Sequence, residues 1–92
     1  MIGKFCVVRT YSAGVHVGTV ASRDGQEVTL TDARRIWYWK GANSLHEIAL
    51  RGVGKGSKVS DSVPSIALTE AIEIIPCTDE SAASLGSVGW AK

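Results

Sequence analysis

The stretch ARRIWYWKG, residues 33–41, concentrates the side chains of this 92-residue chain that could recognise an anion. Aromatic rings can stack on a nucleobase, and arginine can bind a phosphate through two parallel N–H groups. If the stretch is a β-strand, its side chains alternate between two faces, so an arginine and an aromatic ring stay outside the core whichever face is buried. The candidate ligand-binding residues are Arg34, Arg35, Trp37, Trp39 and Lys40, with Tyr11 and His16 as lesser candidates from neighbouring strands.

Two other roles would account for the same aromatic stretch. Tryptophan side chains can simply cover a small core. Trp, Tyr and Arg also dominate the energetics of subunit interfaces. The core, interface and ligand interpretations therefore all stay open at the level of sequence.

The residues that could support catalysis or bind a metal are few and scattered. His16 and His46 are the two histidines, and Cys6 and Cys77 form no CxxC pair, so we expect the cysteines to act as small buried hydrophobes. The glycine-rich GVGKGSK, residues 52–58, lacks the spacing of a phosphate-binding P-loop. We expect a non-enzymatic protein with no metal and no cofactor.

The composition is typical of a globular domain. Hydrophobic residues make up 45% of the chain and charged residues 21%, and the formal net charge is +1. This near-neutral charge argues against nucleic-acid binding, which depends on phosphate neutralisation. No apolar run is long enough for a membrane span, and MIGKFCVVRT lacks the apolar core of a signal peptide. We expect one soluble, cytoplasmic domain over residues 1–92.

The first half of the chain shows the alternation and turn signals of a β-meander over residues 4–40. The expected strands cover residues 4–10, 15–23, 26–31 and 34–40. Asp24-Gly25 predicts a type I′ hairpin turn, in which both central residues have positive φ. Asp32 and Ala33 predict a second short turn.

The second half begins with a predicted helix over residues 44–52. Ser44 and Glu47 would form its capping box, and Gly52 would end it in a left-handed conformation. A polar loop (54–65), a strand (66–75, favoured over a helix by its isoleucines), and a short helix capped by Thr78 with a tail (78–92) complete the chain. The expected class is α+β, mostly β: a small antiparallel barrel or meander of about five strands with one or two short helices.

Residues 14–36, GVHVGTVASRDGQEVTLTDARRI, resemble part of the SH3-like small barrels, particularly the Sm-like variety. The similarity lies in Gly18 within the second strand, Asp24 in the turn and Leu30 in the alternating third strand. Sm-like proteins form rings by strand pairing between subunits and bind RNA around the pore. This chain lacks the second Sm motif and places its helix after the fourth strand, so the resemblance supports a small barrel rather than RNA binding.

A longer stretch also resembles a group of small phage and prophage proteins of unassigned function. It runs over residues 9–53, with LTEAIEIIPCT at residues 68–78. The resemblance implies a viral context, in which short single-domain proteins often blunt host defence or build the particle. It implies no particular site residues.

The function predicted from these observations is a phage-encoded small-molecule binder in the host bacterial cytoplasm, a sponge for a nucleotide-derived immune signal. The alternatives are an Sm-like or SH3-like module that binds RNA or a host protein, and a phage structural or assembly protein. The expected partners are an anionic nucleotide-like molecule and further copies of the chain, from dimer to hexamer, but neither nucleic acid nor a membrane. Oligomerisation is expected because KFCVVRT, residues 4–10, shows no proline and no charge within its central FCVV that would protect a strand edge.

Overall fold

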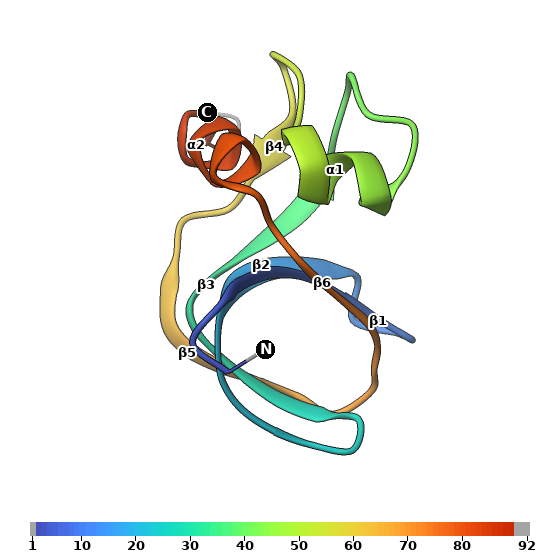
Figure 1. Cartoon of the computed structure of the whole chain (residues 1–92), viewed down its shortest axis with the longest axis vertical. Helices are drawn as coiled ribbons and strands as arrows, with labels where there is room; N and C mark the ends of the chain where they lie inside the picture. The colour runs from blue at the N-terminus through green and yellow to red at the C-terminus, as the bar shows by residue number, and fades with distance from the viewer. Residues whose placement is uncertain (1, 90–92) are drawn as a thin grey trace.

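A computed structural model describes residues 2–89, which form six antiparallel β-strands and two short helices (Figure 1). The expected mostly-β class is confirmed. The strands are β1 (Phe5–Thr10), β2 (Val15–Asp24), β3 (Glu27–Tyr38), β4 (Lys58–Val59), β5 (Val63–Leu68) and β6 (Ala71–Pro76). The helices are α1 (Leu45–Arg51) and α2 (Asp79–Gly86).

The long β2–β3 hairpin is the centre of the sheet. β1 pairs with β2 and with β6, while the other edge of β3 pairs with β5 and, near its end, with β4. The sheet curls strongly (Figure 1), but within residues 2–89 no ladder joins β5 to β6. The strand pairing is therefore open on that side, and a closed barrel is not established.

β1 is an interior strand, contrary to the expectation from KFCVVRT. It lies between β2 and β6, so both of its edges are hydrogen-bonded. The sequence could not show this because the partner strand β6 lies more than sixty positions further along the chain. An exposed β1 edge is therefore no reason to expect oligomers, and the oligomer itself stays a prediction.

The hairpin turn lies one residue later than predicted. Asp24 pairs with Glu27, so Gly25 and Gln26 form the two-residue loop. Gly25 has a φ of 60°, whereas Asp24 is not among the residues with positive φ. Glycine at the first loop position is the pattern of a type II′ turn, not of the expected type I′ turn.

The expected turn at Asp32 and Ala33 is a β-bulge inside one continuous strand. The pairing of β2 with β3 shifts register between Val17 and Thr19, and Asp32 has a φ of 49°. Gly18 lies opposite the bulge, where an added Cβ would lie 3.0 Å from the Thr31 carbonyl oxygen. A bulge and a close backbone approach thus join the two predicted strands, 26–31 and 34–40, into β3.

The predicted loop over residues 54–65 contains β4 and the start of β5. β4 forms because its two residues pair with Ile36 and Tyr38 of β3. This pairing joins distant parts of the chain, and the polar local sequence gave no sign of it.

The predicted strand over residues 66–75 is two strands. β5 pairs with β3 while β6 pairs with β1, so the chain changes direction at Thr69 and Glu70. The carbonyl of Glu70 accepts a hydrogen bond from the Tyr11 N–H at 2.9 Å, and its carboxylate accepts one from the Ser12 hydroxyl at 2.7 Å. Glu70, the residue that interrupts the apolar alternation, therefore lies at the corner where β5 turns into β6.

Both helices lie close to their predicted positions. Thr78 caps α2 by accepting a hydrogen bond from the Ser81 N–H at 3.1 Å. The prediction of a capping box for α1 is wrong. The Ser44 side chain makes no capping hydrogen bond, and Glu47 instead accepts two hydrogen bonds from Asn43. Neither described helix is long and apolar enough to cross a membrane. The end of the predicted tail, residues 90–92, lies outside the described residues.

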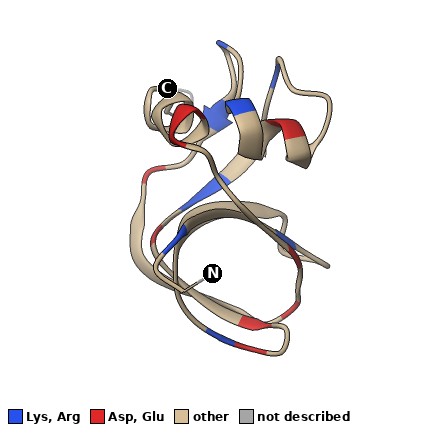
Figure 2. Ribbon diagram, viewed as in Figure 1, with Lys and Arg blue, Asp and Glu red and all other residues tan. Residues whose placement is uncertain are grey.

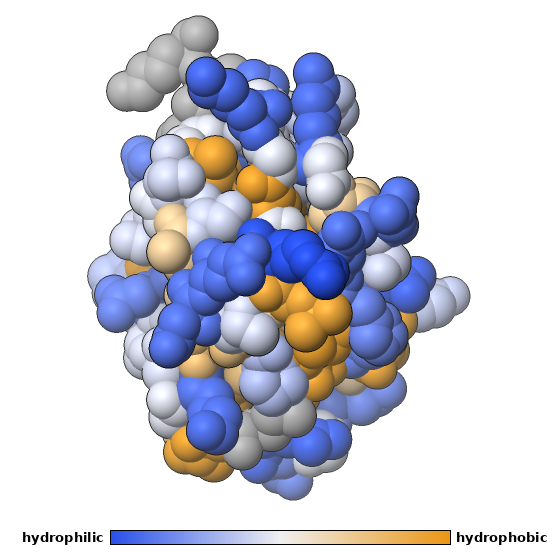
Figure 3. All heavy atoms as spheres, turned by 45° about the horizontal axis from the view of Figure 1, so that its top comes forward, coloured by the Kyte–Doolittle hydropathy of each residue, from blue (hydrophilic) through white to orange (hydrophobic). Residues whose placement is uncertain are grey.

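Hydrophobic residues are buried on both sides of the sheet. The inner cluster comprises Cys6, Val8, Val20, Val28, Leu30, Ala33, Leu68 and Ala71. The outer cluster, beneath the helices, comprises Val7, Val17, Ile36, Ile48, Ala49, Val59 and Leu85. Cys6 belongs to the inner cluster and Cys77 packs against the outer one, and burial raises the pKa of both thiols. Hydrophobic residues also reach the surface between hydrophilic side chains (Figure 3).

We expect Gly52→Ala to lower the free energy of unfolding by about 2 kcal/mol or more. Gly52 ends α1 with a φ of 86°, and an added Cβ would overlap the Ser84 side chain of α2. Urea denaturation measures the effect. Gly86→Ala is the matched control, since nothing lies within 4 Å of its added Cβ. Equal stability of the two variants would contradict the tight contact between the helices.

Candidate functional site

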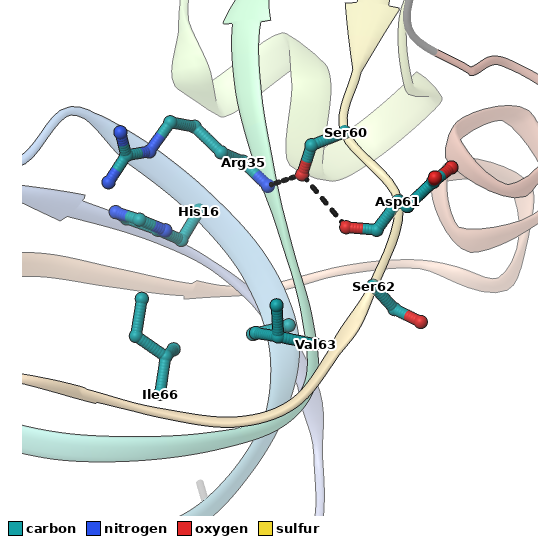
Figure 4. A pocket seen from close by; sticks show the side chains of 8 residues that line it. His16, Arg35, Ser60, Asp61, Ser62, Val63 and Ile66 are labelled. Carbon is teal, nitrogen blue, oxygen red and sulfur yellow. Dashed lines mark hydrogen bonds between the residues drawn. The ribbon is translucent and has the colours of Figure 1, made fainter.

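A cavity of about 330 Å³ lies where β2 and β3 meet the segment that joins β4 to β5 (Figure 4). This volume is near the lower end of the range for small-molecule sites, roughly 300–1,000 Å³. The lining residues are His16, Ala33, Arg35, Ser60, Asp61, Ser62, Val63 and Ile66.

Arg35 and His16 lie together on one wall of the cavity. They are direct partners in the β2–β3 ladder, so their side chains project to the same side of the sheet, as Figure 4 shows. Arg35 is exposed, and its guanidinium makes no hydrogen bond or ion pair with any residue that the structure describes. Its donors are available to an anion.

His16 is almost completely buried, with 1% of its surface exposed. Its Nε2 lies 3.0 Å from the carbonyl oxygen of Ala13, so Nε2 carries the hydrogen and donates it. Burial lowers the pKa of His16; the hydrogen bond to Ala13 opposes this shift, and the nearby Arg35 charge adds to it. The imidazole is therefore neutral at pH 7, with Nδ1 as an acceptor.

Ser60 anchors the other wall of the cavity, which faces His16 and Arg35, to the backbone of β3. Its hydroxyl accepts a hydrogen bond from the Arg35 N–H at 2.8 Å and donates one to the Asp61 carbonyl at 3.0 Å. Its own N–H donates to the Arg35 carbonyl at 2.9 Å. Val63 and Ile66 supply apolar surface below (Figure 4). The cavity thus combines one cation and one neutral imidazole with an apolar floor, and the carboxylate of Asp61 on its rim points away from Arg35 (Figure 4).

Arg34, the neighbour of Arg35, holds the fold together. Its guanidinium donates hydrogen bonds to four backbone carbonyls, those of Val59, Ser60, Leu85 and Val88. These bonds fasten β3 to the segment after β4 and to the end of α2. Few donors remain for a ligand, so the structure gives Arg34 a structural role.

The other predicted site residues do not line the cavity. Trp37 and Tyr38, at the end of β3, are 51% and 44% exposed, and the Lys40 Nζ lies 5.9 Å from the centroid of the Tyr38 ring. Trp39 is partly buried against the outer cluster, as the core interpretation expects. Tyr11 is 77% exposed in the turn between β1 and β2. The cavity therefore brings together only two of the seven predicted residues, Arg35 and His16.

Sequence reasoning missed the wall formed by residues 60–66. That stretch was expected to be mostly loop, yet β5 begins at Val63. Pro64 was the available signal, because a proline beside alternating apolar residues is typical of an edge strand. Within residues 2–89, no group of three or more His, Cys, Asp or Glu side chains could hold a metal ion.

A family model described as a domain of unknown function (DUF6948) matches residues 3–85. The match runs from the start of β1 almost to the end of α2. No curated protein and no solved structure matches the chain.

We expect Arg34→Lys to lower the free energy of unfolding by about 2 kcal/mol, because lysine cannot reproduce the planar array of donors and leaves carbonyls without a partner. Chemical denaturation measures the loss. Arg35→Lys, on the next residue of the same strand, is expected to change stability by no more than about 0.5 kcal/mol. Equal losses at the two positions would show that Arg34 is not the fastening residue.

Stability is expected to fall as the pH drops below about 6.5, the ordinary pKa of histidine. The pKa of His16 is lowered in the folded state, so the unfolded chain binds the proton first and protonation favours unfolding. Denaturation curves between about pH 7.5 and 5.5 should show this dependence reduced in His16→Gln but retained in His46→Gln, a change at an exposed position of α1. The same dependence in all three proteins would refute the assignment to His16.

Proposed function

We propose that this chain, which belongs to the DUF6948 family, is a non-enzymatic module that binds a small anionic molecule in the cavity between β2, β3 and β5. One observation supports the proposal above all. Within the described part of the chain, the exposed Arg35 guanidinium has no partner, and it lies beside the neutral imidazole of His16 over an apolar floor.

The chemistry of the cavity favours a ligand with one anionic group and one apolar or flat part. Arginine binds a carboxylate or phosphate through a fork of N–H donors. The neutral His16 ring offers an acceptor to a donor on the ligand, and Val63 and Ile66 can cover an apolar portion. A single cation suits a ligand with few charges.

The hydrogen bonds around the cavity support binding rather than catalysis. A nucleophile needs a base within hydrogen-bonding reach to accept its proton. The Ser60 hydroxyl instead bonds to the backbone of Arg35 and Asp61, and the Nε2 of His16 bonds to Ala13. Both groups serve to hold the wall in place.

The strand order supports a further proposal about the fold. The first strand pairs with the last, and β5 leads directly into β6, so the curled sheet is a small barrel of the SH3-like kind that is open between β5 and β6. The cavity is then the open end of this barrel, next to the inner cluster, to which Ala33 belongs and against which Ile66 packs.

The biological role that we propose is sequestration of a nucleotide-derived host signal by a phage protein. A sponge acts by stoichiometry, so it must bind tightly and enclose most of its ligand. One chain offers a cavity with one arginine, which matches one phosphate. A signal with several phosphates would need residues from a second copy, which is why we keep the homo-oligomer in the proposal.

Calorimetric titration tests the site. The panel comprises mononucleotides, cyclic di- and trinucleotides, cyclic ADP-ribose isomers and simple carboxylates. We expect at least one to bind, and Arg35→Ala to weaken that binding by about 1.5–3 kcal/mol through the loss of a charged hydrogen bond. Arg9→Ala, at an exposed position of β1, is the matched control and should bind as the wild type does. An inert wild type, or full binding by folded Arg35→Ala, would refute the proposal.

A further inference from the structure

The net charge of +1 conceals two regions of opposite charge. Residues 33–60 contain six Lys or Arg side chains and one acidic residue, Glu47. The rest of the chain contains four Lys or Arg and eight Asp or Glu. Glu47 is occupied by Asn43 and lies 4.0 Å from Arg51. Figure 2 shows cations at the end of the molecule that holds α1 and β4; the acidic start of α2 and Glu47 also lie at this end, and the other acidic positions lie elsewhere. A polyanion would meet a positive region there despite the small net charge.

One exposed aromatic ring, that of Tyr38, and three lysines lie close together at this end. We call Tyr38, Lys40, Lys55 and Lys58 the basic-aromatic surface. Lys58 is the ladder partner of Tyr38, and the Lys40 ammonium lies 5.9 Å from the centroid of the Tyr38 ring. Tyr38 is about half exposed, and Lys40 and Lys55 are exposed.

The glycine-rich segment after α1 is anchored beside the end of β3. The Gly54 N–H donates a hydrogen bond to the Lys40 carbonyl at 2.6 Å, and the Lys40 N–H donates one to the Ser57 hydroxyl at 2.9 Å. An added Cβ at Gly54 would lie 2.9 Å from the Lys40 carbonyl oxygen, so glycine permits this approach. The anchoring brings the segment that carries Lys55 next to the lysine at position 40.

We propose that the basic-aromatic surface binds single-stranded nucleic acid. Bases stack on exposed aromatic rings with little regard to sequence, while lysines neutralise the adjacent phosphates. A mononucleotide would leave most of its area in water on such an open surface, whereas a strand can stack a base on Tyr38 and also bring several phosphates to the lysines. The site is separate from the cavity, so it does not depend on the function proposed there.

Fluorescence anisotropy with labelled twelve-residue oligo-dT and oligo-U, over a series of salt concentrations, tests this surface. We expect wild-type binding that weakens with salt. Tyr38→Ala should weaken it about 5- to 150-fold through the loss of stacking, while Tyr38→Phe retains binding. The Lys40→Ala/Lys58→Ala double variant should reduce the slope of log K against log salt by about 1.4, about 0.7 for each phosphate contact with a single strand.

The Lys4→Ala/Arg9→Ala double variant removes the same charge from exposed positions elsewhere and should retain the wild-type slope. Circular dichroism establishes that each variant folds. Three outcomes would overturn the proposal: no wild-type binding at the lowest salt, equal weakening by the two double variants, or unchanged binding by Tyr38→Ala. Binding to phosphatidylserine vesicles or to a phosphopeptide, without binding to the oligonucleotides, would also overturn it.

Discussion

The hydrogen bonds of Arg34 are the interaction on which the rest of the structure depends. One guanidinium joins a central strand, the segment after β4 and the last turn of α2, which are far apart in the sequence. Carbonyl groups at a helix end and after a short strand have no regular partner, and a charged donor satisfies them more strongly than a neutral one. The helical layer that covers the outer cluster and the wall that carries Ser60 are both held by this residue.

β3 organises both proposed binding regions because it pairs with three other strands. Its bulge at Asp32 redirects the strand between the inner cluster and Arg35. Ile36 pairs with both β2 and β4; beyond it β3 leaves β2 and continues beside β4, which places Tyr38 opposite Lys58. β3 therefore contributes residues to both the cavity and the basic-aromatic surface. The two regions follow one another along the strand, on either side of the point where its pairing with β2 ends.

Features fixed by neighbouring residues were predictable, and features fixed by distant partners were not. The β2–β3 hairpin, the end of α1 at Gly52 and the Thr78 cap follow from local residue types. The corner at Glu70, the interior position of β1 and the existence of β4 each depend on pairing between remote segments. For the candidate site, the sequence pointed to the arginine-rich strand, but Arg34 and Arg35 are chemically identical there. Only the packing of α2 distinguishes Arg34, which donates hydrogen bonds to the end of that helix, from Arg35, whose guanidinium has no partner among the described residues.

The adjacency of these two arginines has an evolutionary consequence. A fold whose stability and ligand recognition rested on one residue could not change its ligand without losing its structure. Here Arg34 makes the structural hydrogen bonds and the proposed ligand recognition falls on Arg35; the backbone between them is held by Ser60. If Arg35 recognises the ligand as proposed, a substitution at position 35 would alter ligand preference while Arg34 preserves the architecture around it.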